Sequence, residues 1–227
     1  MNTPSNDSNQ VHHAGLPIDQ KVCVVTGGGQ PRGKAVAEAL ANAGAKTVAI
    51  TYSDDRDAAH ETYLAIQAIG AGCLLAQMDV TDRSSVRKVL LWVTDQVGKI
   101  DVLVNAEETS WPDSIGSATA GERLKAVGVN IRAQALTADE VLPFMGIQRT
   151  GGLVIGVAVD DGVSEALKNF NEPGVAASVT AAISPMTALA ATRQVTLRVL
   201  PFGPPEQVAD AVVELSTDTH AEAGDSG

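Results

Sequence analysis

Short apolar runs alternate with amphipathic stretches along most of the chain. The runs have the length and the Val, Leu and Ile content of buried strands, and they predict strands at 21–26, 46–51, 72–77, 101–105, 153–158 and 195–200. Apolar residues at helical spacing fill the intervals, as at Val86, Leu90, Val93 and Val97. Longer helices are predicted over 120–145 and 173–193, and a short one over 206–215.

This alternation of strand and helix predicts an α/β fold, a Rossmann-like doubly wound parallel sheet with helices on both faces in three layers. Gly44 and Gly70 stand where helices are expected to end. We expect residues 19–216 to form a single domain. The polar segment 1–18 is expected to be a disordered leader, and the small, polar residues 217–227 a flexible tail.

Composition and charge narrow the class of protein. Hydrophobic residues make up 44% of the chain and charged residues 19%, as in a globular protein, and the net charge of −11 argues against nucleic acid or an anionic membrane as a partner. No apolar run reaches membrane-spanning length, and the leader lacks the apolar segment of a signal peptide, so we expect a cytoplasmic protein. Cys23 and Cys73 fall in predicted strands, which favours buried thiols over a disulfide or a metal site.

The segment 26–33 reads Thr-Gly-Gly-Gly-Gln-Pro-Arg-Gly and lies between a predicted strand and a predicted helix. A glycine-rich turn in that position is typical of a dinucleotide-binding site, in which the helix N-terminus receives the pyrophosphate. Further signals follow at Asp79-Val80, Asp101–Asn105, Val129-Asn130 and Val141–Met145. Together these segments resemble the short-chain dehydrogenase/reductase family, especially its ketoacyl-reductase-like members, from about residue 19 to 200 and again over 205–212.

The resemblance implies an NAD(P)-dependent oxidoreductase ancestry, but the glycine turn departs from the family pattern. Thr26, Gly27 and Gly33 match it, while Pro31 replaces the middle glycine. Proline has neither a bare Cα nor an N–H to offer a phosphate, so this change predicts the loss of tight dinucleotide binding. Proline is also welcome at the first position of a helix, and both interpretations can hold together.

Other cofactor positions are altered too. The family's Asn-Asn-Ala-Gly becomes Asn105-Ala106-Glu107-Glu108, and the resemblance places Glu108 at the glycine that lies against the cofactor. A carboxylate there would repel a pyrophosphate, unless the loop is rearranged and both glutamates lie in water. Asp79 matches the family's adenine-contacting aspartate, or it is a residue of the next helix start. We therefore regard Gly27, Gly33, Asp79 and Asn105 as a remnant of a cofactor site, with no cofactor bound by this chain and no cofactor preference readable.

The family's catalytic tyrosine, lysine and serine are missing. The resemblance places them at Glu172, Ala176 and Val159, and only Asn130 matches its catalytic counterpart. No Tyr-x-x-x-Lys occurs in the chain. Valine and alanine cannot hold a carbonyl or lower a neighbour's pKa, so hydride transfer loses its proton donor. Glu172 could serve as an acid or base in another reaction, but Pro173 beside it also suits the start of a helix.

The leading hypothesis is a non-catalytic subunit that stabilises or completes an active homologue in a hetero-oligomer, with NAD(P) bound by that homologue. The family's pairing helices, here 120–145 and 173–193, would form the contact. Heteromeric hydroxyacyl-CoA dehydrogenases, such as that of the benzylsuccinate (anaerobic toluene) pathway, have this design. The substrate lid after 195–200 and the family's last strand are expected to be absent. The alternatives are a non-redox cyclase, dehydratase or isomerase, a weak NAD(P)-dependent reductase, and a ligand-sensing module.

Overall fold

A computed structural model of the chain describes residues 16–108, 120–148, 150–158, 187, 189–201 and 203–217. Within them, six parallel strands form one sheet in the order β3-β2-β1-β4-β5-β6. This order and direction confirm the doubly wound fold. The strands lie within one residue of the predicted bounds: β1 (Val22–Val25), β2 (Thr47–Tyr52), β3 (Gly72–Gln77), β4 (Val102–Asn105), β5 (Gly152–Val157) and β6 (Val195–Leu200).

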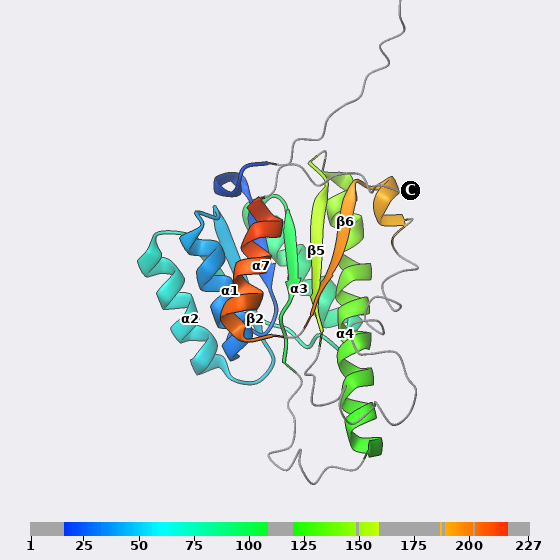
Figure 1. Cartoon of the computed structure of the whole chain (residues 1–227). Helices are drawn as coiled ribbons and strands as arrows, with labels where there is room; N and C mark the ends of the chain where they lie inside the picture. The colour runs from blue at the N-terminus through cyan, green and yellow to red at the C-terminus, as the bar shows by residue number, and fades with distance from the viewer. Residues whose placement is uncertain are drawn as a thin grey trace, which may run out of the picture.

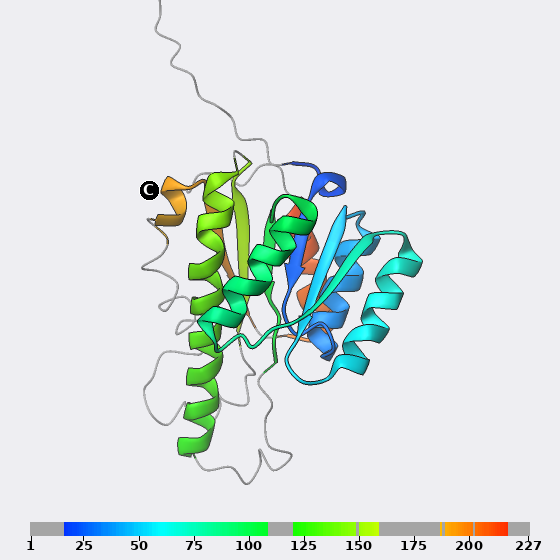
Figure 2. The same ribbon diagram turned by 180° about the vertical axis from the view of Figure 1, so that it is seen from behind.

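Helices cover both faces of the sheet. One face carries α1 (Pro31–Asn42), α2 (Arg56–Ile69) and α7 (Pro205–Thr217). The other carries α3 (Arg83–Val97) and α4 (Ala120–Ile147), which lie in front of the sheet when the molecule is turned round (Figures 1 and 2). A single 3-10 turn, η1 (Ile18–Gln20), precedes β1. Residues 1–15 of the predicted leader and 218–227 of the predicted tail lie outside the described residues, as does most of the predicted helix 173–193. Ile18, which was assigned to the leader, begins η1, and Thr217, which was assigned to the tail, is the last residue of α7.

The central strands form the boundary between two hydrophobic cores. All four residues of β1 and all four of β4 are buried, because both faces of a parallel sheet are covered by helices. Val24 and Leu103 belong to the core under α3 and α4, whereas Val25 and Val104 belong to the core under α1 and α7. The alternation of side chains along each strand therefore divides a continuous apolar run between the two faces.

Local signals set most helix ends. The Asp55 side chain accepts a hydrogen bond from the Ala58 N–H at 2.9 Å and caps α2. Gly70 ends that helix in the left-handed conformation, with φ of +102°, as predicted. Gly44, with φ of +95°, comes directly after the C-cap of α1, which confirms the second predicted end.

The connection after β6 is short. Residues 201–204 alone separate β6 from α7, which leaves no room for a substrate-covering segment of the length that the family resemblance implies. β6 is the last strand of the described sheet and lies at its edge. The described residues end with α7, so the expectation of a missing last strand falls on residues outside them.

Gly33 is the glycine that brings α1 closest to the turn. A Cβ on Gly33 would overlap the carbonyl group of Gly27, which is backbone and cannot move aside cheaply. Gly128, in α4, has no atom within 4 Å of its would-be Cβ.

We therefore expect Gly33→Ala to lower the free energy of unfolding by about 2–3 kcal/mol, because the added methyl overpacks the junction. Gly128→Ala is the matched control, since it also replaces a helical glycine. It should leave stability unchanged or raise it by up to about 1 kcal/mol. Urea denaturation followed by circular dichroism measures both, and equal effects would contradict this role of Gly33.

Candidate functional site

The order of the strands reverses between β1 and β4, which pair directly with each other in the centre of the sheet. In doubly wound folds, ligands bind in the crevice beyond the carboxyl ends of the strands at such a reversal. Two segments meet there: the glycine turn 26–30 after β1, and the segment 105–108 at the end of β4. The candidate site is built from these two segments and from the parts of α1 and α4 next to them.

Thr26 joins the two segments. Its hydroxyl oxygen accepts hydrogen bonds from the N–H groups of Ala106 and Glu107, at 3.0 and 3.1 Å. Its own N–H donates to the Val104 carbonyl at 3.0 Å. The side chain is completely buried. These bonds hold the segment after β4 against the glycine turn.

The glycine turn keeps a compact form. Gly27 adopts a φ of +69°, which only glycine reaches without strain, and its carbonyl accepts from the Gln30 N–H at 2.8 Å. Gly28 N–H donates to the Thr51 carbonyl at 2.7 Å, so the turn is also tied to β2. Helix α1 then begins at Pro31, in the first helical position. This confirms the interpretation that this proline starts the helix.

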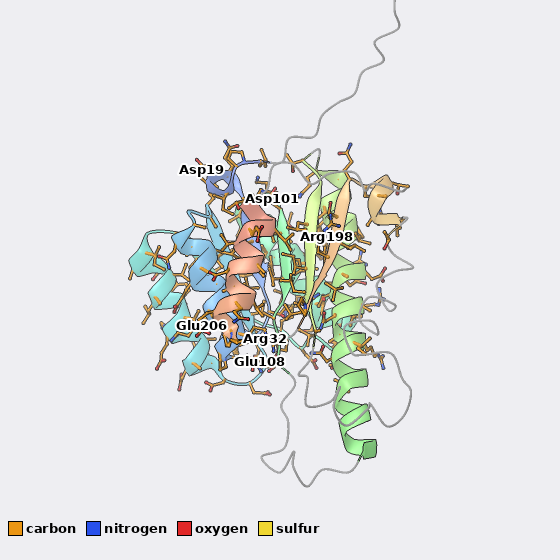
Figure 3. All side chains as sticks on the ribbon, in the orientation of Figure 1. Asp19, Arg32, Asp101, Glu108, Arg198 and Glu206 are labelled. Atoms are coloured by element: carbon orange, nitrogen blue, oxygen red, sulfur yellow. The ribbon has the colours of Figure 1, made fainter. Side chains whose placement is uncertain are left out.

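Glu108 lies at the N-terminus of α1. Its carboxylate Oε1 accepts a hydrogen bond from the Arg32 N–H at 2.7 Å. The Gln30 side chain adds two bonds: its Nε2 donates to the Glu108 carbonyl at 3.0 Å, and its Oε1 accepts from the Glu108 N–H at 2.6 Å. Figure 3 shows Arg32 and Glu108 together at this end of the sheet. The chain's own carboxylate thus occupies the position at which a helix N-terminus would receive a pyrophosphate.

Glu107 carries a largely buried carboxyl group. Burial raises its pKa to about 7; a hydrogen bond from the Ser53 hydroxyl opposes this shift, and the negative charges of Asp54, Asp79 and Glu108 add to it. Its Oε2 is buried and accepts no hydrogen bond from the described residues. Since Glu107 is largely buried and Glu108 is bound to α1, the alternative in which both glutamates lie in water is wrong.

Polar side chains of α4 form hydrogen bonds with the segment that follows β4 and with the end of β5. Asn130 donates from Nδ2 to the Glu107 carbonyl at 3.3 Å, and its Oδ1 accepts from Gln134 Nε2 at 2.6 Å. The same Gln134 nitrogen donates to the Val157 carbonyl at 2.7 Å, at the end of β5. Asn105 is bound to α4 as well, because its Oδ1 accepts from the Thr137 hydroxyl at 2.5 Å. Asn130 and Asn105 are therefore both linked to Gln134 of α4, Asn130 through the Gln134 side chain and Asn105 through the Gln134 carbonyl.

Gln134 and Thr137 were not singled out in the sequence. The sequence did contain a signal for them: they are polar, they follow Asn130 by four and seven positions, and this spacing puts them on the face of the long predicted helix that carries Val141. Both are at least 95% buried, which identifies that face as a polar contact with the ends of β4 and β5.

Asp79 lies at the turn between β3 and α3. It is exposed, and its Oδ1 accepts from the N–H and the hydroxyl of Thr81, at 2.8 and 2.6 Å. The N-cap of α3 is Asp82, whose side chain accepts from the N–H groups of Ser84 and Ser85. Asp79 thus shapes the turn before the helix rather than capping it. The other predicted positions, Val159, Glu172 and Ala176, lie outside the described residues.

In the described part of the chain, no group of three His, Cys, Asp or Glu residues could hold a metal ion. None of the helices described is both long and apolar enough to cross a membrane. Cys23 and Cys73 are free thiols; Cys23 is buried, as predicted, whereas Cys73 is half-buried, and burial raises the pKa of each thiol to about 12.

The raised pKa of Glu107 predicts a pH-dependent stability. The folded protein holds this proton more tightly than the unfolded chain, whose pKa is near 4.5. The resulting stabilisation is complete below about pH 4.5 and is lost as the pH rises through about 7. We expect Glu107→Gln to remove this loss, so that the stability of the variant relative to the wild type is about 3 kcal/mol more favourable at pH 8 than at pH 4.5.

Chemical denaturation across this pH range measures the difference. Glu61→Gln, which changes an exposed carboxylate on α2, is the control. If the two variants show the same pH profile, the buried carboxyl group does not carry the effect.

Known proteins similar to this chain are reductases and oxidoreductases. The chain is 32% identical over 148 residues to the hydroxynaphthalene reductase arp2 of Aspergillus fumigatus, with 63% of this chain and 54% of that protein covered. It is 32% identical over 139 residues to the versicolorin reductase stcU of Emericella nidulans, with 61% and 51% covered. The chain thus spans about half the length of these curated relatives.

Solved structures support the same fold. A metagenomic short-chain oxidoreductase in complex with NADP superposes with a TM-score of 0.69 at 22% identity, covering 90% of this chain and 94% of that one. A profile of the short chain dehydrogenase family matches residues 21–198. Strand order, glycine turn and profile agree, and the chain belongs to the short chain dehydrogenase family.

Proposed function

We propose that this chain is a non-catalytic member of the family, which stabilises or completes an active, NAD(P)-dependent homologue in a hetero-oligomer. One observation carries the proposal: the Glu108 carboxylate accepts the Arg32 N–H at the start of α1, so this arrangement does not fit a dinucleotide pyrophosphate. The complex would act on a hydroxyacyl or ketoacyl substrate of the CoA type, as in the ketoacyl-reductase-like members that the sequence resembles.

The residues at the expected catalytic positions support the loss of hydride chemistry. Hydride transfer to a carbonyl needs a proton donor and a group that holds the carbonyl oxygen. Val159 and Ala176 supply neither, and no tyrosine is followed by a lysine four residues later. The Asn130 side chain is hydrogen-bonded to the Glu107 carbonyl and to Gln134.

Exposed apolar side chains on the two proposed pairing helices support a partner there. Val129 is 44% exposed and Ile147 85% exposed on α4, while Leu189, near the end of the second helix, is 43% exposed. Apolar groups in these positions cost free energy in water and gain it at an interface. Both helices carry such residues, as a subunit with a homologous partner requires.

A weak NAD(P)-dependent reductase is the second candidate, because the similar curated proteins are named as reductases. That function needs the carboxylate of Glu108 to leave α1 whenever the cofactor binds. It also needs a proton donor in a place other than the family's tyrosine position.

Association with a homologue tests the main proposal. Co-expressed with an intact homologue from the same genome, the tagged chain should retain that protein through gel filtration. Val129→Asp should weaken the association by roughly 10- to 100-fold, because a charge is buried in the contact. Leu64→Asp is the matched control, since Leu64 is 53% exposed but lies on α2, away from the proposed pairing helices.

The purified chain alone should not oxidise NADPH with acetoacetyl-CoA, whereas the complex should. A stable homo-oligomer that retains no homologue would refute the partner role. Turnover by the chain alone would establish the weak reductase instead.

A further inference from the structure

We propose that Glu108 forms an autoinhibitory contact, which closes a preserved anion site at the start of α1 against pyrophosphate-bearing nucleotides. The contact consists of three hydrogen bonds that join Glu108 to Gln30 and Arg32, and we call it the Glu108 clamp. This inference rests on the proposed loss of cofactor binding, and it adds what prevents that binding.

The start of α1 takes its hydrogen-bond acceptor from a distant part of the chain. Its N-cap is Gln30, whose side chain makes no capping hydrogen bond to the helix. Pro31 follows and has no N–H, so the Arg32 N–H is the first donor of the helix. Glu108, 76 residues further along the chain, supplies the acceptor and places a negative charge at the positive end of the helix.

The second arm of the clamp fixes the backbone of Glu108. The Gln30 side chain both donates to and accepts from the backbone of this one residue. Because the three bonds are part-buried, water competes with them less than on an open surface. The carboxylate is therefore aimed at α1 by two attachments, one through its backbone and one through its side chain.

A pyrophosphate at this helix N-terminus would compete for the same N–H and would meet a like charge a few ångströms away. Apart from Pro31, which replaces the family's middle glycine, the turn that would receive it keeps its compact form, with Gly27 at φ of +69° and Gly28 bound to β2. The apparent affinity of such a site equals its intrinsic affinity multiplied by the fraction of molecules in which the clamp is open, so a clamp that is mostly closed lowers it. Removal of the carboxylate should thus raise the affinity without a new contact.

The test is nucleotide binding by the full chain, with NADPH, NADH and ADP as probes in isothermal titration. Glu108→Ala should bind NADPH at least about tenfold more tightly than the wild type, because the closed fraction disappears. Glu108→Gln, which removes the charge but keeps the size, should lie between them. Asp57→Ala is the matched control, since it removes an exposed carboxylate from the first turn of α2, and it should bind as the wild type does.

Amide hydrogen exchange gives a second, ligand-free measurement. The Arg32 amide should exchange slowly in the wild type and Asp57→Ala, and faster in Glu108→Ala. Thermal unfolding confirms that each variant folds. If Glu108→Ala does not fold, Glu108→Gln and Gln30→Ala, which breaks the other arm, decide by the same two measurements.

Two results would overturn the inference. In one, the folded variants bind NADPH no more tightly than the wild type, so the clamp does not close the site. In the other, the Arg32 amide exchanges as fast in the wild type as in Glu108→Ala, so the bond between Glu108 and Arg32 does not form. Neither result bears on retention of a homologue, which alone tests the partner role, so the two proposals can fail separately.

Discussion

The hydroxyl of Thr26 is the constraint on which the candidate site depends. Parallel pairing of β1 with β4, in the register Val25 to Val104, brings the ends of these strands side by side. The buried hydroxyl then accepts two N–H groups from the segment after β4, which would otherwise lack partners at considerable cost. This anchor directs Glu107 towards the ends of β2 and β3, and Glu108 towards α1.

The two ends of the sheet differ in how their charges are satisfied. At the amino end, Asp101 accepts from the Val22 N–H and from Lys99, both at 2.8 Å, and Lys21 donates to the Ser216 carbonyl at the end of α7. Figure 3 shows Asp101 at the end of the molecule opposite Arg32 and Glu108. At the carboxyl end, the neighbours of Glu107 that shift its pKa upward are all carboxylates. Unfavourable charge is thus concentrated at the crevice where the family places its ligand, as is common at functional or formerly functional sites.

The sequence predicted the fold well and the site only in part. Buried parallel strands are continuous apolar runs, so all six were found, and Gly27 and Gly33 were placed correctly. The Arg32–Glu108 bond was not predicted, because the two residues are 76 positions apart and no periodic pattern links them. The family resemblance did bring Glu108 to the right place, but it could not show that the carboxylate caps a helix.

Pro31 and Glu108, two departures from the family pattern, are physically coupled in the structure. Proline removes the first helical N–H and leaves that of Arg32 as the leading donor, and Glu108 accepts it. A glycine at 31 would return one donor to the turn, yet the charge of Glu108 would still face any phosphate that approached. A glycine at 108 would remove that charge but leave Arg32 without its acceptor. Glu108 thus supplies an acceptor and a negative charge to the helix end at which Pro31 leaves Arg32 as the first donor, and this stabilises the start of α1 from within the chain.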